Sequence, residues 1–141
     1  MVLFAVGFCG CASHPLPAPP QTNCAADDPR VGWIAELNGR MHGITGVARI
    51  VDNCTIVIEH FYYDGIAVDS RVVGIVNWDF KNVNVLTGPI MRATPYVDET
   101  LTVPLPEGMT LDDVPVISID CLTGNDLFGI GSFAEAAFHA P

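Results

Sequence analysis

The sequence has few basic residues: lysine occurs once, and lysine and arginine together number six against sixteen aspartate and glutamate residues. The formal net charge is −10 at pH 7. A protein that binds nucleic acid must neutralise phosphates, and one that docks on anionic lipid needs a basic surface. We therefore expect no nucleic-acid partner, and attachment to a membrane only through a lipid anchor.

Motifs of common enzymes are also missing from the sequence. It contains no G-x-S-x-G, no H-E-x-x-H, no phosphate-binding loop and no paired-carboxylate spacing. These motifs bring a nucleophile, a metal or a phosphate into a defined geometry, so their absence weakens the case for a hydrolase, a transferase or a metalloenzyme. The sequence leans against an enzyme without deciding the question.

Charged residues are scarce as well, at 16% of the chain, whereas 50% of the residues are hydrophobic. Such a composition excludes intrinsic disorder. The length of 141 residues indicates one domain. Glycine, proline, valine, isoleucine and threonine are plentiful, which favours short strands joined by many turns.

The N-terminal residues 1–11 are apolar and resemble the core of a secretory signal, but they are too short to span a bilayer. The run F-C-G-C-A-S also resembles a lipoprotein cleavage site, after which Cys11 would be the acylated first residue. The alternatives are an ordinary cleaved signal peptide and an N-terminal tail that carries no targeting signal. We expect an extracytoplasmic protein, either secreted or anchored as a lipoprotein.

A proline-rich segment follows at residues 12–30. Five of its residues are proline, which excludes a helix or a central strand and predicts an extended N-terminal arm or linker. Cys24 lies inside this segment. A cysteine is unusual in a free tether, so we expect Cys24 to be attached to the domain.

Two β-rich runs, residues 44–51 and 55–61, are separated by Asp-Asn-Cys, which predicts a hairpin because Asp and Asn tolerate positive φ. Ile58 and Phe61 have opposite parity along the second run. A bulge near Glu59 and His60 would let both apolar side chains reach the core.

Further strands are expected at residues 33–37, 71–78, 83–86, 101–105, 116–121 and 127–133, and Thr110–Asp113 is expected to cap a single helical turn. About seven to eight short strands predict an all-β, antiparallel sandwich or small barrel. The predicted domain covers residues 31–135 and is followed by a tail at 136–141.

Polar and aromatic residues around the hairpin form a possible ligand or partner surface; they are His42, His60, Tyr62, Tyr63 and Asp64. The two histidines with Asp64 offer metal ligands, and a histidine with Met41 offers haem ligands. No spacing here is a metal signature, so we favour surface or turn histidines with ordinary hydrogen bonds and predict no metal or cofactor. We expect one tyrosine ring in the core and the other at the surface.

Five cysteines are present, and three remain if Cys9 and Cys11 are removed or lipidated. Three cysteines form at most one pair, so one thiol is left over. In the strand 116–121, Ile117, Ile119 and Cys121 share one face, which directs Cys121 inward at the end of its strand. No basic residue flanks Cys121 to stabilise a thiolate, so a merely buried cysteine is the alternative to a reactive one.

Several segments together resemble the DM-thirteen domain, a small extracellular β-rich module found beside DOMON domains and b-type cytochromes. They are H-G-I-T-G-V-A-R-I-V-D, T-I-V-I-E-H-F-Y-Y-D-G, L-P-E-G-M-T-L-D-D-V, I-S-I-D-C and L-F-G, in this order between Trp33 and Phe133. The resemblance implies a redox or electron-transfer association, with the cysteine of the late strand, Cys121, as the candidate redox thiol. It also implies a disulfide between Cys24 and Cys54.

The sequence thus supports two functional interpretations. The first is an exported accessory domain of a redox or electron-transfer system, with Cys121 as its thiol and a cytochrome or DOMON-type partner that carries any haem. The second is a non-catalytic binding or structural module of the cell surface, whose end loops, including Tyr62–Asp69, contact a ligand.

Overall fold

The computed structural model describes residues 14–124 and 126–137. The predicted signal segment with Cys11, and the end of the predicted tail, lie outside these residues. Eight strands form one antiparallel sheet in the order β5-β4-β7-β8-β1-β2-β3-β6. Their bounds are β1 Ile34–Gly39, β2 Thr45–Asp52, β3 Thr55–Tyr63, β4 Ser70–Ile75, β5 Asn84–Val85, β6 Tyr96–Pro104, β7 Val116–Cys121 and β8 Asp126–Ser132.

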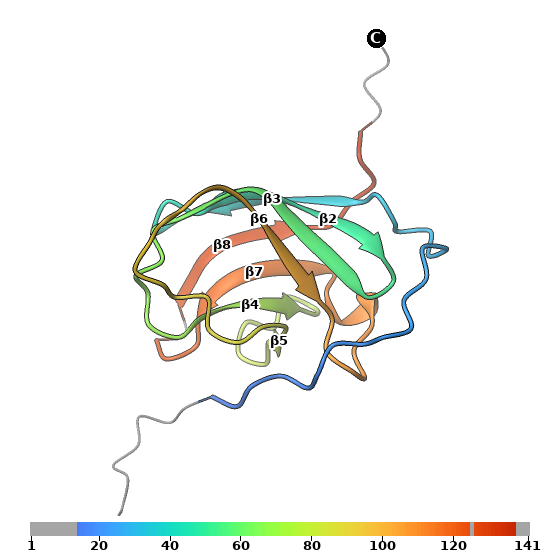
Figure 1. Ribbon diagram of the computed structural model, residues 1–141, viewed down its shortest axis with the longest axis horizontal. Helices are drawn as coiled ribbons and strands as arrows, with labels where there is room; N and C mark the ends of the chain where they lie inside the picture. Colours follow the sequence, from blue (N-terminus) through green and yellow to red (C-terminus); the bar gives the residue numbers. More distant parts are fainter. Residues whose placement is uncertain (1–13, 125, 138–141) are drawn as a thin grey trace, which may run out of the picture.

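The sheet curls so that β1, β2, β3 and β6 lie over β4, β7 and β8, as a half-barrel (Figure 1). The concave side holds the main core, in which Ile44, Ile56, Phe61, Leu105 and Ile119 are fully buried. This architecture confirms the prediction of a single all-β antiparallel domain with about eight strands.

The hairpin of β2 and β3 forms where Asp-Asn-Cys predicted it. Its pairing is interrupted between Ile58 and Phe61 on the β6 side, and His60 in the gap has φ of 51°. Both Ile58 and Phe61 are fully buried, which confirms the predicted bulge.

Residues in β4 are buried on both faces of the sheet. Val72 belongs to the main core, whereas Val73 and Ile75 join Val116 in a second cluster on the other face. Val83 and Val85 from the β5 segment pack against this second cluster. The short β5 pairs with β4 at the edge of the sheet, and the valines of its segment extend this second cluster.

The proline-rich arm lies along the domain and contacts both sides of the opening in the half-barrel (Figure 1). Near its start, the Arg71 guanidinium donates to the carbonyls of His14 and Pro15, both at 2.8 Å. Farther along, the N–H of Gln21 donates to the Leu105 carbonyl at 3.2 Å. Because prolines hold it extended, the arm follows the gap between β4 and the end of β6.

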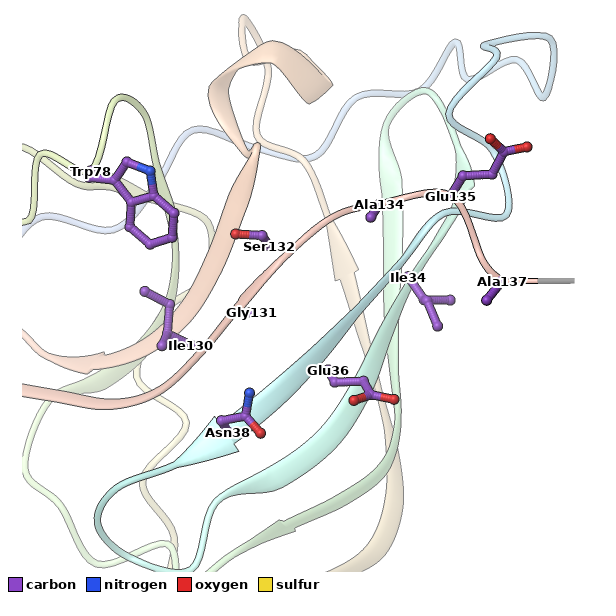
Figure 2. Close-up of a pocket in the computed structure, with 10 residues that line it drawn as sticks. All are labelled: Ile34, Glu36, Asn38, Trp78, Ile130, Gly131, Ser132, Ala134, Glu135 and Ala137. Atoms are coloured by element: carbon purple, nitrogen blue, oxygen red, sulfur yellow. The ribbon is translucent and has the colours of Figure 1, made fainter. Parts of the chain in front are cut away.

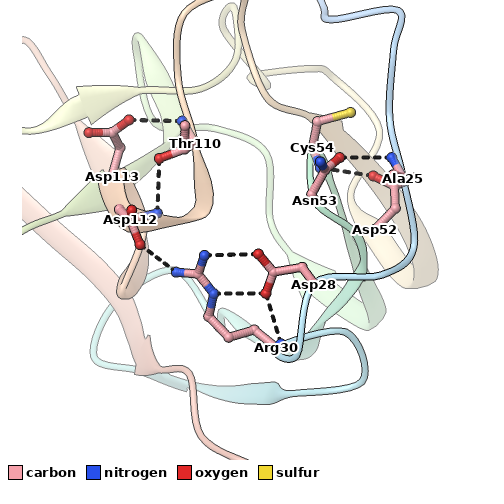
Figure 3. A network of polar contacts seen from close by, with 9 residues as sticks. All are labelled: Ala25, Asp28, Arg30, Asp52, Asn53, Cys54, Thr110, Asp112 and Asp113. Carbon is pink, nitrogen blue, oxygen red and sulfur yellow. Dashed lines mark hydrogen bonds and ion pairs between the residues drawn. The ribbon is translucent and has the colours of Figure 1, made fainter.

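The end of this arm is joined to the hairpin. Cys24 and Cys54 are at disulfide distance, with Cα atoms 5.6 Å apart and a sequence separation of 30 residues. Beside the turn, the Ala25 N–H donates to the Asn53 side-chain oxygen at 2.9 Å (Figure 3). The pair of cysteines predicted from the family resemblance is therefore in place.

The arm next reaches Arg30, which connects it to the short 3-10 helix η1, Leu111–Asp113 (Figure 3). Arg30 pairs with Asp28 at 3.0 Å and with Asp112 at 2.7 Å. The hydrogen bonds from Arg30 lower the pKa of the Asp28 carboxyl. Thr110 and Asp113 form a capping box at the helix start, which confirms the predicted helical turn.

Candidate functional site

The register of the sheet separates the cysteines. Cys54 lies in the turn between β2 and β3, at the end of the sheet where β7 begins; we call this the disulfide end. Cys121 closes β7 at the opposite end, beside Ser70 and Asp126 in the register; we call this the thiol end. A six-residue strand such as β7 is roughly 20 Å long, so Cys121 is far from the disulfide.

Cys121 is the free cysteine among the described residues. It is partly buried and packs against the main core, which confirms that its strand directs it inward. Its thiol donates to the Val68 carbonyl at 3.0 Å, and the Leu122 N–H donates to the Asp69 carbonyl at 3.3 Å. The loop between β3 and β4 is therefore attached to the strand end that carries the thiol.

Tyr63 organises the interior of this end. Its hydroxyl donates to Ser70 Oγ at 2.7 Å and accepts the Ala67 N–H at 3.1 Å. Burial raises the pKa of the Tyr63 phenol, the hydrogen bonds with Ser70 and Ala67 oppose this, and the charges of nearby Asp64 and Cys121 raise it further. Because Ser70 is the register partner of Cys121, the phenol and the thiol belong to one site.

Aromatic rings continue from Tyr63 toward the surface. Tyr63 stacks on Tyr96 with ring centroids 5.8 Å apart, and Phe61 meets Tyr96 edge-on at 5.1 Å. The Arg92 guanidinium lies over the Tyr96 ring, 3.5 Å from its centroid. These contacts fix the rings at the thiol end by packing and by a cation–π interaction.

The predicted histidines are not brought together into one site. His42 pairs with Asp64 at 2.8 Å and its ring packs edge-on against Phe128 at 4.6 Å. His60, displaced at the bulge, pairs with Asp98 at 2.7 Å. Each histidine thus has its own carboxylate partner, His42 in the turn between β1 and β2 and His60 within β3.

The two adjacent tyrosines divide as predicted. Tyr63 is buried and Tyr62 is exposed. The loop that follows them exposes two apolar side chains, Ile66 at 65% and Val68 at 62%. The thiol end therefore presents apolar surface directly beside the Val68 carbonyl, which accepts the hydrogen bond from the Cys121 thiol.

A buried carboxyl precedes the thiol in β7. Asp120 is buried on the opposite face of the strand, where it shares a hydrogen bond with the Ser118 hydroxyl. Burial raises the pKa of Asp120 to about 6, and the Ser118 hydrogen bond only partly opposes the shift. Asp120 therefore changes its charge in mildly acidic solution.

Among the described residues, Cys24, Asp52 and Cys54 form a group with metal-ligand spacing. The two sulfurs in this group are the ones at disulfide distance. A disulfide removes the thiolates that a soft metal needs, so the group is better explained by the cross-link.

Several residues of the thiol end could not be identified from the sequence pattern. Ser70 and Val68 carry no motif, and they reach Tyr63 and Cys121 only through the strand register and the loop conformation. The Phe128 ring that packs on His42 comes from β8. Spacing along one chain does not encode these contacts, although the inward parity of Cys121 did indicate its side of the strand.

No helix among the described residues is long and apolar enough to cross a membrane. The fold and the site define a small all-β domain with one cysteine pair at one end and one free thiol at the other. A family model described as "Electron transfer DM13" matches residues 36–132, more than half of the chain, so the chain belongs to this family. It is accordingly an electron-transfer-related module. No curated protein and no solved structure gives a significant match.

Proposed function

We propose that this chain is an exported accessory domain of an electron-transfer system, and that Cys121 is its redox thiol. The observation that carries the proposal is the separation of the cysteines. Cys24 and Cys54 are paired at one end, which leaves Cys121 as the free thiol of the described residues, partly exposed at the other end. The family match over residues 36–132 supports an electron-transfer role in general.

The cysteine pair also supports an extracytoplasmic location for the domain. Disulfides form and persist in oxidising compartments and are rare in the cytosol. Export through the apolar segment 1–11, with or without a lipid on Cys11, is part of the proposal.

The partner that we propose is a redox protein of the cytochrome or DOMON kind. Ile66 and Val68 would contact it, because these exposed side chains lie in the loop that is hydrogen-bonded to the thiol. In the chemical step, the Cys121 sulfur attacks a partner disulfide and gives up its proton. A sulfur–sulfur bond forms to Cys121, the partner disulfide breaks, and the departing sulfur takes a proton.

Oxidised glutathione provides a test of this exchange in a chain that carries Cys9→Ser and Cys11→Ser, so that residues 1–11 contribute no thiol. We expect intact-mass spectrometry to show one glutathione adduct on each native chain, reversed by reduced glutathione. The Cys121→Ser variant should give none, because the cysteine pair at the disulfide end is not available as a thiol. A native chain that forms no adduct, while the denatured chain forms one, contradicts the redox role.

The exposed side chains of Ile66 and Val68 also favour a second function, that of a non-catalytic surface-binding module. In that case the loop contacts a ligand without thiol chemistry. Cys121→Ser would then retain all function in the native host, whereas Ile66→Ser combined with Val68→Ser would abolish it. The redox proposal expects both sets of variants to lose function.

A further inference from the structure

The approach to the Cys121 sulfur passes over Gly124, in the connection between β7 and β8. Cys121 ends β7, and its register partner is Asp126, the first residue of β8. A Cβ atom placed on Gly124 would lie 3.8 Å from the Cys121 sulfur and 2.8 Å from the Asp126 Oδ2 atom. The sulfur and this carboxylate oxygen therefore flank the same point, and the exposed Gly124 has no side chain to fill it.

Asp126 is available for contact at this point. It is exposed, and within residues 14–124 and 126–137 it takes part in no ion pair. Arg40 lies at the same end of the sheet, where its backbone N–H donates to the Phe128 carbonyl at 2.7 Å. The Arg40 side chain nevertheless forms no ion pair with Asp126. The carboxylate is therefore open to a positive group that arrives beside the sulfur.

Other charged groups of the thiol end are already paired. The Arg71 guanidinium donates to Asp69 at 2.8 Å, and its remaining N–H groups donate to backbone carbonyls of the arm. His42 pairs with Asp64 at 2.8 Å. Asp126 is thus the carboxylate that borders the approach to the thiol without a partner of its own.

A carboxylate in this position discriminates between disulfides by their charge. In thiol–disulfide exchange the attacked disulfide must reach the Cys121 sulfur, so the groups attached to its sulfurs pass beside Asp126. A positive group is attracted there and a negative one is repelled, more strongly than in bulk water because the effective dielectric constant near a protein surface is lower. The net charge of −10 adds a longer-range attraction for cations.

We propose that Asp126 is a specificity-determining residue, which directs Cys121 to disulfides that carry a positive charge next to their sulfurs. This inference rests on the proposed thiol exchange and names its substrate class, a partner disulfide flanked by lysine or arginine. In the step, the Cys121 sulfur bonds to one sulfur of that disulfide, the disulfide bond breaks, and the departing sulfur takes the proton that the thiol gives up. Asp126 contacts the positive group and forms no covalent bond.

Three small disulfides test the proposal on the full chain with Cys9→Ser and Cys11→Ser in place and the Cys24–Cys54 disulfide intact. Cystamine is a dication, bis(2-hydroxyethyl) disulfide is neutral, and dithiodiglycolate is a dianion. Intact-mass spectrometry follows adduct formation with time, and each rate is divided by the rate of the same disulfide with N-acetylcysteine amide. We expect cystamine to react roughly tenfold faster than the neutral disulfide at low salt, and the dianion to react most slowly.

Variants of Asp126 identify the source of this preference. Asp126→Asn should lower the ratio of the cystamine rate to the neutral rate about threefold, and Asp126→Lys should reverse the preference in favour of dithiodiglycolate. The ratio within one variant is the readout, because a change in the fraction of thiolate affects both rates equally. Asp126→Glu should keep the preference of the parent.

Glu36→Gln is the matched control, because it removes the same charge far from the thiol. Glu36 lines an open groove on the outer face of β1 and β8, and it makes no ion pair among the described residues (Figure 2). The register places Glu36 level with Ser132 and hence with Val116 at the start of β7, whereas Cys121 is at its end. Glu36→Gln should therefore react like the parent.

The outcomes separate this inference from the proposed function. Adducts that form at similar relative rates with all three disulfides would leave the redox thiol in place and overturn the role of Asp126. Equal losses of preference in Asp126→Asn and Glu36→Gln would show that net charge alone sets the rates, which also overturns it. No adduct with any of the disulfides would contradict the redox thiol itself, and this inference with it.

Discussion

The two ends of the curled sheet, the disulfide end and the thiol end, differ in how they are held together. At the disulfide end, Cys24 is joined to Cys54, Arg30 links the arm to Asp112, and a capping box closes the short helix (Figures 1 and 3). At the thiol end, Cys121 ends its strand beside the loop that exposes Ile66 and Val68. The disulfide and the ion pair that hold the arm lie at one end, and the partly exposed thiol lies at the other.

This difference explains how a disulfide and a free thiol coexist in one small domain. Because the strands between them are roughly 20 Å long, the thiol cannot attack the disulfide in the folded chain. A partner therefore reaches the thiol without disturbing the cross-linked end.

The largest expected effect comes from breaking the disulfide end. We expect Cys24→Ser combined with Cys54→Ser to lower the free energy of unfolding by about 2–4 kcal/mol, because the arm is released from the hairpin. Urea denaturation measures this loss. Cys121→Ser is the control at the other end and should cost less than about 1 kcal/mol. Equal losses in the two variants would contradict the contrast between the ends.

A smaller effect, of opposite sign, is expected at Asp120. Its pKa is raised to about 6 in the fold, above the ordinary value of 3.8, so the folded state binds more protons between these pH values. Stability from a protonated Asp120 is therefore present at low pH and is lost as the pH rises through about 6. We expect Asp120→Asn to raise the free energy of unfolding by about 2 kcal/mol at pH 7.5 and by much less at pH 4.

Urea denaturation at both pH values checks the prediction for Asp120. Asp126→Asn, a change at an exposed carboxylate near the start of β8, is the control and should leave the pH dependence of the parent unchanged. The same gain at pH 4 and pH 7.5 in Asp120→Asn would show that the buried charge is not the cause.

Tyr63 tests the internal support of the thiol end. Tyr63→Phe leaves the Ala67 N–H and the Ser70 hydroxyl without their buried partner, so we expect a loss of about 1–2 kcal/mol in the free energy of unfolding. Tyr62→Phe removes an exposed hydroxyl and should change the free energy little. Thermal unfolding of both variants measures these changes. If Tyr63→Phe were as stable as Tyr62→Phe, the Tyr63 hydroxyl would not stabilise the thiol end.

The smallest effect is expected at Arg30. The Arg30 side chain is 29% exposed, that of Asp28 18% and that of Asp112 82%, so both pairs lie at the surface, where ion pairs contribute little. Arg30→Gln should lower the free energy of unfolding by about 0.5–1 kcal/mol, less so in high salt. A loss as large as that of the double cysteine variant would show that the ion pairs, and not the disulfide, hold the arm.

Local features of this fold could be predicted from the sequence. The hairpin follows from Asp-Asn between two β-rich runs, the bulge from the parity of Ile58 and Phe61, and the helix cap from Thr110 and Asp113. Each of these depends on neighbouring residues only. For the same reason, the inward side of Cys121 followed from strand alternation.

Features set by distant residues were predicted less well. β6 begins at Tyr96, five residues before the predicted start, because pairing with β3 stabilises a polar stretch that has no apolar alternation of its own. β4 ends at Ile75 because Asn77 and Trp78 adopt left-handed conformations. The contact of Tyr63 with Ser70, and that of Cys121 with Val68, depend on loop geometry that no local pattern specifies.

Alkylation of Cys121 in the native protein tests the central claim most directly. With the disulfide intact, and with Cys9→Ser and Cys11→Ser in place, time-resolved intact-mass spectrometry with iodoacetamide should show one alkyl group added per chain, at a rate close to that of the denatured protein. Ile66→Ser combined with Val68→Ser should fold and keep this rate, because the thiol itself is unchanged. Labelling that occurs only after denaturation would show that Cys121 is a closed core residue and would contradict the account.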